Sequence, residues 1–258
     1  ERIRNRSEEV HIGLVGKYVK LHDAYLSVAE AMSHAGYELN TFVRIHWIDS
    51  ENITKENVNG ILEGLDGIII PGGFGNRGIE GMIQSANYAR KNQIPYFGIC
   101  LGMQIAVIEF ARNVLGLKDA HSGEFDEQCE HKVIDFMPGQ SEEIDKGGTL
   151  RLGSYPCSIK AGTKLEKCYG NKLIYERHRY EFNNKYREEL MRAGLVVSGT
   201  SPDDRLVETV ELQGHPFFVG VQFHPEFKSR PNRSHPLFKG FISAARVMKC
   251  SRIKRKEE

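Results

Sequence analysis

Cys100 stands between two glycines, after an apolar run and before a segment with helical character. A side chain at a tight strand-to-helix turn projects out of the sheet. Gly98 and Gly102 leave room for such a turn, because a Cβ there would collide with neighbouring backbone. The unpaired N–H groups at the start of a helix also favour a thiolate. The pattern is typical of a nucleophile elbow, and the alternative is a buried cysteine that only packs.

A histidine follows a second apolar run, with a carboxylate two residues later, as His224-Pro225-Glu226. Residues two apart in an extended chain project to the same side, and Pro225 biases His224 toward extended geometry. The Glu226 carboxylate can then hold one ring nitrogen while the other faces a thiol. This is the arrangement of nucleophile, base and orienting group used in covalent catalysis. A surface turn is the alternative interpretation.

Nucleophilic chemistry of this kind also needs N–H donors for a developing oxyanion. The segment after Ile70 contains Gly72, Gly73 and Gly75, whose N–H groups can approach a ligand without obstruction by side chains. The N–H of Leu101, directly after the cysteine, would be a second donor. A plain glycine turn is the alternative here.

These parts lie far apart in the sequence, so a sheet must bring them together. Apolar or β-branched runs predict strands before Cys100 and over residues 10–15, 41–48 and 67–70. Helical spacing follows from the cysteine to residue 114 and over residues 24–32, 54–64 and 79–91. The alternation predicts an α/β fold with a doubly wound, mostly parallel sheet flanked by helices, and a ligand site beyond the carboxyl ends of its strands.

The second half of the chain has a different pattern. Loops are expected over residues 119–128 and 138–148. A mixed or antiparallel extension of the sheet is predicted from short strands over residues 172–183, 195–200, 206–212 and 216–223. Helices are predicted over residues 187–193 and 237–248. We expect residues 1–248 to form a single domain and residues 249–258 to be a basic, disordered tail.

Composition argues against several classes of protein. The 258 residues include 35 Lys and Arg against 34 Asp and Glu, a net charge of +1, so neither nucleic acid nor a membrane surface is an expected partner. The spacing of the five cysteines suits neither a disulfide framework nor a metal site, so we expect no metal and a reducing, cytoplasmic location. These cysteines are Cys100, Cys129, Cys157, Cys168 and Cys250. The chain begins with Glu1 rather than methionine, and we expect it to be a piece of a longer protein.

The segment Gly98-Ile99-Cys100-Leu101-Gly102-Met103-Gln104, taken with His224-Pro225-Glu226, resembles the triad-type, class I glutamine amidotransferases. The resemblance covers nearly the whole chain and implies their flavodoxin-like fold. Five further stretches resemble the glutaminase domain of the CTP synthase family: residues 15–18, 71–78, 147–153, 176–183 and 215–227.

The resemblance implies hydrolysis of L-glutamine. Cys100 would attack the side-chain carboxamide to form a glutamyl thioester, His224 would protonate the departing ammonia and later activate water, and Glu226 would orient His224. The backbone of Gly73 and Leu101 would form the oxyanion hole. The residues implied to bind L-glutamine are Gly73, Phe74, Leu101, Gln104, Glu124 and Arg179.

Glu124 would take the ammonium of the substrate and Arg179 its carboxylate, which suits their charges. A solvated loop carboxylate is the alternative for Glu124, and a structural ion pair is the alternative for Arg179. The resemblance also places activation by GTP near Arg77 and Arg151.

The resemblance implies no cofactor in this domain. Ammonia would pass to a separate, N-terminal synthetase domain, absent from this chain, which aminates UTP to CTP with ATP and Mg. GTP would be an allosteric activator, and the full-length protein would be a homo-oligomer, a tetramer. Two alternatives remain: another triad-type amidotransferase or a γ-glutamyl hydrolase on the same fold, and a non-catalytic assembly module.

Overall fold

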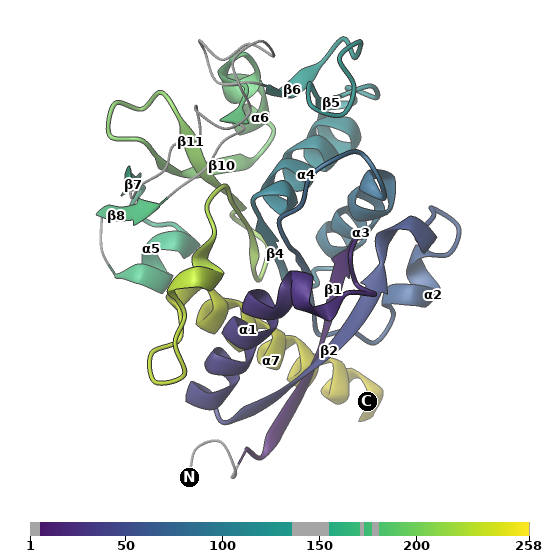
Figure 1. Cartoon of the computed structure of the whole chain (residues 1–258), viewed down its shortest axis with the longest axis vertical. Helices are drawn as coiled ribbons and strands as arrows, with labels where there is room; N and C mark the ends of the chain where they lie inside the picture. The colour runs from purple at the N-terminus through teal and green to yellow at the C-terminus, as the bar shows by residue number, and fades with distance from the viewer. Residues whose placement is uncertain (1–5, 136–154, 171–172, 177–180, 258) are drawn as a thin grey trace.

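The computed structural model of the chain describes residues 6–135, 155–170, 173–176 and 181–257 (Figure 1). A nine-stranded sheet runs through its centre in the order β2-β1-β3-β4-β12-β11-β10-β7-β8. Its strands are β1 (Glu8–Gly16), β2 (Thr41–Asp49), β3 (Gly67–Ile70), β4 (Tyr96–Ile99), β7 (Tyr155–Ile159), β8 (Leu173–Glu176), β10 (Leu195–Thr200), β11 (Val207–Leu212) and β12 (Phe218–Val221).

The sheet has a parallel half and an antiparallel half. Strands β2, β1, β3, β4 and β12 pair in parallel, and β11, β10, β7 and β8 continue the sheet in antiparallel pairs. The expected mostly parallel sheet with an antiparallel C-terminal extension is therefore confirmed. A second, three-stranded sheet consists of β5 (His121–Ser122), β6 (Lys132–Asp135) and β9 (Glu181–Phe182).

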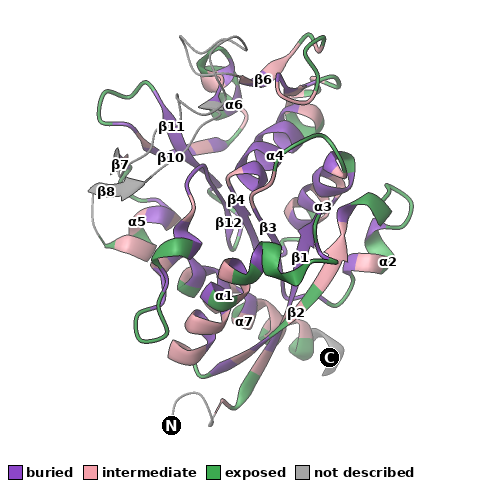
Figure 2. Ribbon diagram, in the orientation of Figure 1, coloured by how far each residue is buried: buried purple, intermediate pink, exposed green. Residues whose placement is uncertain are grey.

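Helices cover both faces of the central sheet (Figures 1 and 2). One face carries α1 (Leu26–Glu38), α5 (Lys164–Tyr169) and α7 (Pro236–Glu257). The other carries α2 (Val58–Leu62), α3 (Ile79–Lys91), α4 (Leu101–Phe110) with its π-helical continuation Ala111–Leu115, and α6 (Arg187–Arg192). Single 3-10 turns span His22–Tyr25, Ser50–Asn52, Asn184–Tyr186 and Pro225–Lys228.

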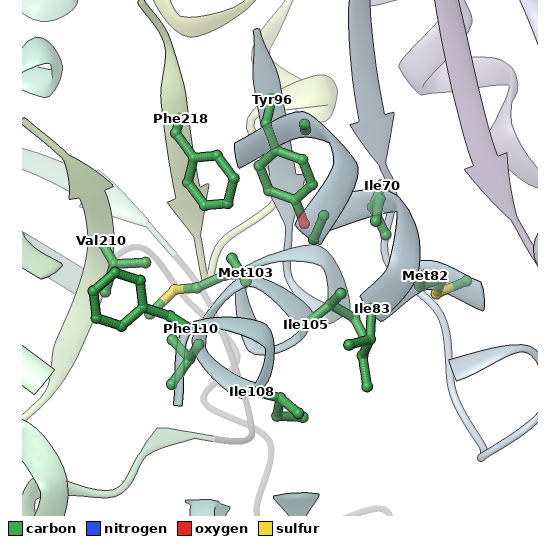
Figure 3. Close-up of a cluster of buried hydrophobic side chains, with 14 of the residues drawn as sticks. Ile70, Met82, Ile83, Tyr96, Met103, Ile105, Ile108, Phe110, Val210 and Phe218 are labelled. Atoms are coloured by element: carbon green, nitrogen blue, oxygen red, sulfur yellow. The ribbon is translucent and has the colours of Figure 1, made fainter. Parts of the chain in front are cut away.

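The buried strands have side chains on both faces, which explains their continuous apolar runs. Phe97 of β4 packs edge-on against Phe238 of α7, with ring centroids 5.2 Å apart. Its neighbour Tyr96 points to the opposite face and stacks on Phe218 at 4.4 Å. Figure 3 shows Tyr96 and Phe218 next to Met103 of α4, in the core between the sheet and α3 and α4. Helix α4 is buried along its whole length, so this core holds the helix that begins at Cys100.

The predicted helix over 79–91 and the predicted strands over 67–70 and 195–200 match the structure residue for residue. The predicted strand over 172–183 is instead two strands, β8 and β9, in different sheets. Helix α5 was missed, although Thr163 accepts from Glu166 N–H and Glu166 accepts from Gly162 N–H. This Thr-x-x-Glu capping pattern was a readable signal in the sequence. Strands β5, β6 and β7 were also missed, and β5 lies within the expected loop over 119–128. The expected loop over 138–148 lies outside the described residues.

The expectation of a disordered tail over 249–258 is wrong for residues 249–257, which continue helix α7. Lys249 Nζ donates to Glu9 O, and Arg252 lies 2.7 Å from the buried carboxylate of Asp66. Basic residues at the end of a helix also interact favourably with its dipole. The cluster that resembled a solvated tail therefore attaches the last helix to the sheet. Among the described residues, no helix is long and apolar enough to cross a membrane.

Candidate active site

The three predicted parts of the site meet at the carboxyl ends of three adjacent strands, β3, β4 and β12. Cys100 follows β4, and its N–H donates to Val221 O of β12 at 2.7 Å. Gly72 follows β3, and a Cβ built on it would lie 2.8 Å from His224 Cε1 and 3.5 Å from Cys100 Cβ. The structure therefore brings the cysteine, the histidine and the glycine-rich turn into one place, where any side chain at Gly72 would displace the imidazole.

The backbone at Cys100 has the strained geometry of a nucleophile elbow. Its φ of +53° and ψ of −103° lie outside the regions that side chains favour, and the residue is the N-cap of α4. A Cβ on Gly98 would overlap Gly102 O, and a Cβ on Gly102 would overlap Ile70 O. Tyr96 supports the turn by donating its hydroxyl to Gly102 O at 2.7 Å. Both glycines are therefore required by close backbone approach, as the sequence pattern predicted.

His224 links the thiol to a buried carboxylate. Its Nδ1 lies 2.8 Å from Glu226 Oε1, and the ring also hydrogen-bonds with Cys100. Burial by itself would lower the pKa of His224, but the hydrogen bonds and charges of Cys100 and Glu226 outweigh it and raise the pKa to about 10. The ring therefore keeps its proton at neutral pH. An imidazolium is the partner that a thiolate requires.

The glycine-rich turn lies against the start of α4. A Cβ on Gly73 would be 3.5 Å from Leu101 Cδ2, so the two predicted oxyanion donors belong to adjacent segments. Leu101 is the first residue of α4, where a backbone N–H has no intrahelical acceptor. Gly75, at φ +77°, uses a backbone conformation that favours glycine.

Lys17 supports this turn and was not predicted from the sequence. Its buried Nζ donates to Phe74 O at 3.1 Å and also to Gly75 O. Desolvation lowers the pKa of Lys17 to about 8, although the charge of Glu124 opposes the shift. The ammonium therefore connects the loop after β1 to two carbonyls of the glycine-rich turn.

The predicted glutamine-binding residues are only partly brought together. Glu124 Oε1 lies 3.5 Å from Gly75 N, so its carboxylate reaches the glycine-rich turn. Gln104 is buried in the first turn of α4, and Phe74 is 64% exposed at the turn. Arg179 and Arg151 lie outside the described residues.

Gln222 is a second residue that the sequence interpretation missed. Its Nε2 lies 3.6 Å from Cys100 Sγ. Its position was the one signal in the sequence, because Gln222 directly follows the apolar run that forms β12 and lies two residues before His224. Within the described part of the chain, three buried oxygens of this site have no hydrogen-bond donor: Gln104 Oε1, Gln222 Oε1 and Glu226 Oε2.

Metal-ligand residues gather elsewhere. In the described ranges, the side chains that could share one ion are Asp119, Glu130 and His131. None of them belongs to the Cys100 site.

Comparison with known proteins agrees with this geometry. The family model for "Glutamine amidotransferase class-I" matches residues 20–244. The chain therefore belongs to the class-I glutamine amidotransferase family. A solved glutaminase domain of CTPS from Trypanosoma brucei, with bound acivicin, superimposes with a TM-score of 0.86 at 40% identity, over 92% of this chain and 94% of that one. Within the family, the chain groups with the glutaminase domains of CTP synthases.

Curated relatives give the same result. CTP synthase from Listeria innocua is 61% identical over 246 residues, and CTP synthase from Bacillus subtilis is 56% identical over 246 residues. Each alignment covers 95% of this chain and 46% of the relative. The chain thus spans about half the length of the curated relatives it matches.

Proposed function

We propose that this chain hydrolyses L-glutamine to glutamate and ammonia through a thioester on Cys100. The observation that carries the proposal is the continuous chain of contacts at the elbow. Glu226 Oε1 lies 2.8 Å from His224 Nδ1, and the same ring hydrogen-bonds with the thiol of a cysteine held at φ +53°. A nucleophile, a base and an orienting carboxylate in this order are the requirements of acyl transfer through a covalent intermediate.

The reaction would proceed in two halves. The Cys100 thiolate attacks the carboxamide carbon, and the resulting oxyanion faces the N–H groups of Gly73 and Leu101. His224 gives its proton to the nitrogen, the C–N bond breaks, and ammonia leaves a glutamyl thioester. His224 then takes a proton from water, the hydroxide attacks the thioester carbon, and the C–S bond breaks to release glutamate. Loss of one oxyanion donor typically costs about 100- to 1000-fold in rate.

Glutamine would be held by the groups that surround this centre. The Glu124 carboxylate, which lies 3.5 Å from Gly75 N, can pair with the substrate ammonium. We place Gln104 in the pocket on the family resemblance. The main chain of Gly73, Phe74 and Leu101 completes the pocket in this proposal. We assign the substrate carboxylate to Arg179 on the family resemblance alone.

The proposal extends to the longer protein of which this chain would be part. Ammonia would be delivered to a separate synthetase domain that aminates UTP to CTP with ATP and Mg, and GTP would activate the glutaminase. This domain would itself need no cofactor. The full-length protein would be a cytoplasmic tetramer. The support is the similarity to CTP synthases that are about twice as long as this chain.

The proposal is tested by covalent labelling. We expect a chloroketone analogue of glutamine to modify Cys100 alone among the five cysteines, with one adduct per chain by peptide mass spectrometry. Excess glutamine should protect the thiol, and Cys100→Ala should take up no label. An adduct on Cys129 or Cys168 with Cys100 unmodified would overturn the mechanism. Absence of any glutamine-protected adduct would favour the non-catalytic assembly module.

A further inference from the structure

The side-chain amide of Gln222 reaches the reactive sulfur from a direction that the catalytic triad does not use. Its Nε2 lies 3.6 Å from Cys100 Sγ, within the range of an N–H···S hydrogen bond, and its side chain is fully buried. We propose that Gln222 donates to the sulfur of Cys100 and stabilises it as a thiolate, in the resting site and when it leaves the thioester. This inference rests on the proposed glutaminase function and deepens its account of the nucleophile.

The fold holds Gln222 from both sides. Its own N–H donates to Glu208 O of β11 at 2.9 Å. The preceding residue, Val221, accepts from Cys100 N–H at 2.7 Å on the other side. The two backbone hydrogen bonds fix the start of the side chain next to the elbow, so the amide needs little ordering to reach the sulfur.

The orientation of the amide follows from the chemistry of its neighbours. His224 keeps its proton because the raised pKa of its ring lies near 10, so the ring meets the sulfur as a donor. A thiolate paired with an imidazolium can only accept hydrogen bonds, and the amide N–H is the group of Gln222 that can donate.

A packing role does not explain this residue. With the N–H directed at the sulfur, Gln222 Oε1 is buried and has no donor among the described residues. A buried polar atom without a partner destabilises the folded state, and an apolar side chain of the same length would avoid that cost. The contact with the sulfur is the interaction that offsets it.

The same N–H would act again in the second half of the reaction. When water attacks the glutamyl thioester, the C–S bond breaks and its electron pair returns to the sulfur. Negative charge then develops at the atom to which Gln222 donates, so the amide favours departure of the thiolate.

Two charged side chains of the described residues are linked to the sulfur. His224 hydrogen-bonds with it, and Glu226 lies behind the ring. On β11, Glu208 holds the Gln222 backbone. The turn after β3 brings Gly72, and the first turn of α4 brings the neutral Leu101 and Gln104. When the Gln222 donor is removed, the imidazolium of His224 remains as the charged partner of the sulfur.

The test measures how the reactivity of the Cys100 sulfur depends on pH, in the absence of glutamine. Alkylation of Cys100 by iodoacetamide is followed from pH 5 to 10 by peptide mass spectrometry in wild type, Gln222→Met and Gln222→Glu. Loss of a hydrogen bond to a charged acceptor should move the pH midpoint of alkylation up by about one unit in Gln222→Met. Gln222→Glu, which has the same shape but adds a negative charge, should move it further.

Thr209→Val is the matched control. Thr209 is buried on β11 and hydrogen-bonds with Ser198 at 2.8 Å, so this change also removes a buried polar contact from the sheet. It should leave the midpoint unchanged. Circular dichroism and the thermal midpoint of each variant establish that it is folded, and Gln222→Leu, which also removes the donor without adding charge, provides the result if Gln222→Met does not fold.

A pH midpoint that stays at the wild-type value in folded Gln222→Met, or in Gln222→Leu where Gln222→Met does not fold, would overturn the inference. A shift as large in Thr209→Val would overturn it too, because the effect would then be a general response to a damaged sheet. Failure of the proposed function gives a different result: the wild-type chain would not hydrolyse glutamine or take up the chloroketone, whereas the alkylation midpoints would still report on Gln222.

Discussion

Cys100 lies beside three residues from two segments, the turn after β3 and the segment after β12. Gly72 leaves space for the imidazole, His224 supplies the proton, and Gln222 directs an amide at the sulfur. The buried Glu226 holds His224 on its other side at 2.8 Å. The reactivity of one atom is therefore a property of the ends of β3, β4 and β12 together, and substitutions at this scale should be visible in the pH dependence of the protein.

The raised pKa of His224 predicts a pH-dependent stability. Because the folded pKa of about 10 lies above the ordinary 6.5, the interactions of the ring contribute stability that is fully present below pH 6.5 and is lost as pH rises through 10. Glu226→Gln removes one cause of the shift and leaves the Cys100 thiol in place in both proteins. We expect wild type to lose about 1–2 kcal/mol more unfolding free energy than Glu226→Gln between those pH values, a figure discounted because the His224 side chain is 34% exposed.

Urea unfolding at pH 6 and pH 10 measures this difference. Lys17 titrates in the same range, with its pKa near 8, but it does so in both proteins and cancels from the comparison. Equal losses in the two proteins would contradict the assigned coupling between His224 and Glu226.

At the scale of elements, the elbow is a close contact between β3, β4 and the first turn of α4. Gly102 packs against Ile70 O of β3, and Gly98 packs against Gly102 O. Lys17, in the loop after β1, donates to two carbonyls of the glycine-rich turn. Helix α4 is buried throughout, so it cannot move away to relieve a clash at its first turn.

Gly102→Ala should therefore destabilise the chain although alanine favours helices. The added Cβ overlaps Ile70 O, and we expect the unfolding free energy to fall by about 1–3 kcal/mol, together with slower alkylation of Cys100. Gly60→Ala is the control, since this glycine of α2 has no neighbour within 4 Å and the change should be neutral or stabilising. Similar urea midpoints for the two variants would show that the elbow is not tightly packed.

At the scale of the molecule, the proposed site lies at the carboxyl edge of the sheet, and α7 packs on one of its faces. The last turns of α7 attach to β1 through Lys249 and to Asp66 through Arg252. The chain covers 46% of the length of its CTP synthase relatives. We therefore expect the ammonia produced at Cys100 to be used by a domain that this chain does not contain.

Joining this chain to the synthetase portion of a CTP synthase relative tests that expectation. In the joined protein, Cys100→Ala should abolish glutamine-driven CTP formation and leave ammonia-driven formation within about twofold of wild type, because the ammonia is supplied directly. The readout is CTP formed from UTP and ATP with each nitrogen source. Loss of both activities in a folded variant would contradict the division of labour, as would full glutamine-driven activity.

Several elements of this architecture can be predicted from the sequence alone. The runs 67–70 and 195–200 and the helix over 79–91 were predicted to the residue, because hydrophobic periodicity and turn residues act locally. The tail over 249–258 was misjudged because its basic residues find partners more than 180 positions away, as Arg252 does at Gly64. Composition alone cannot distinguish a solvated cation from one that attaches a helix.

The sequence by itself predicts Cys100 as the nucleophile, His224 as its base and Glu226 as the orienting carboxylate. The glycines on either side of Cys100 and the proline after His224 restrict the backbone locally. Local restrictions of this kind are visible in the sequence. Only the tertiary structure decided that Lys17 supports the glycine-rich turn and that Gln222 reaches the sulfur. Gln222 and Cys100 are 122 positions apart, and it is the parallel pairing of β4 with β12 that places them within 3.6 Å of each other.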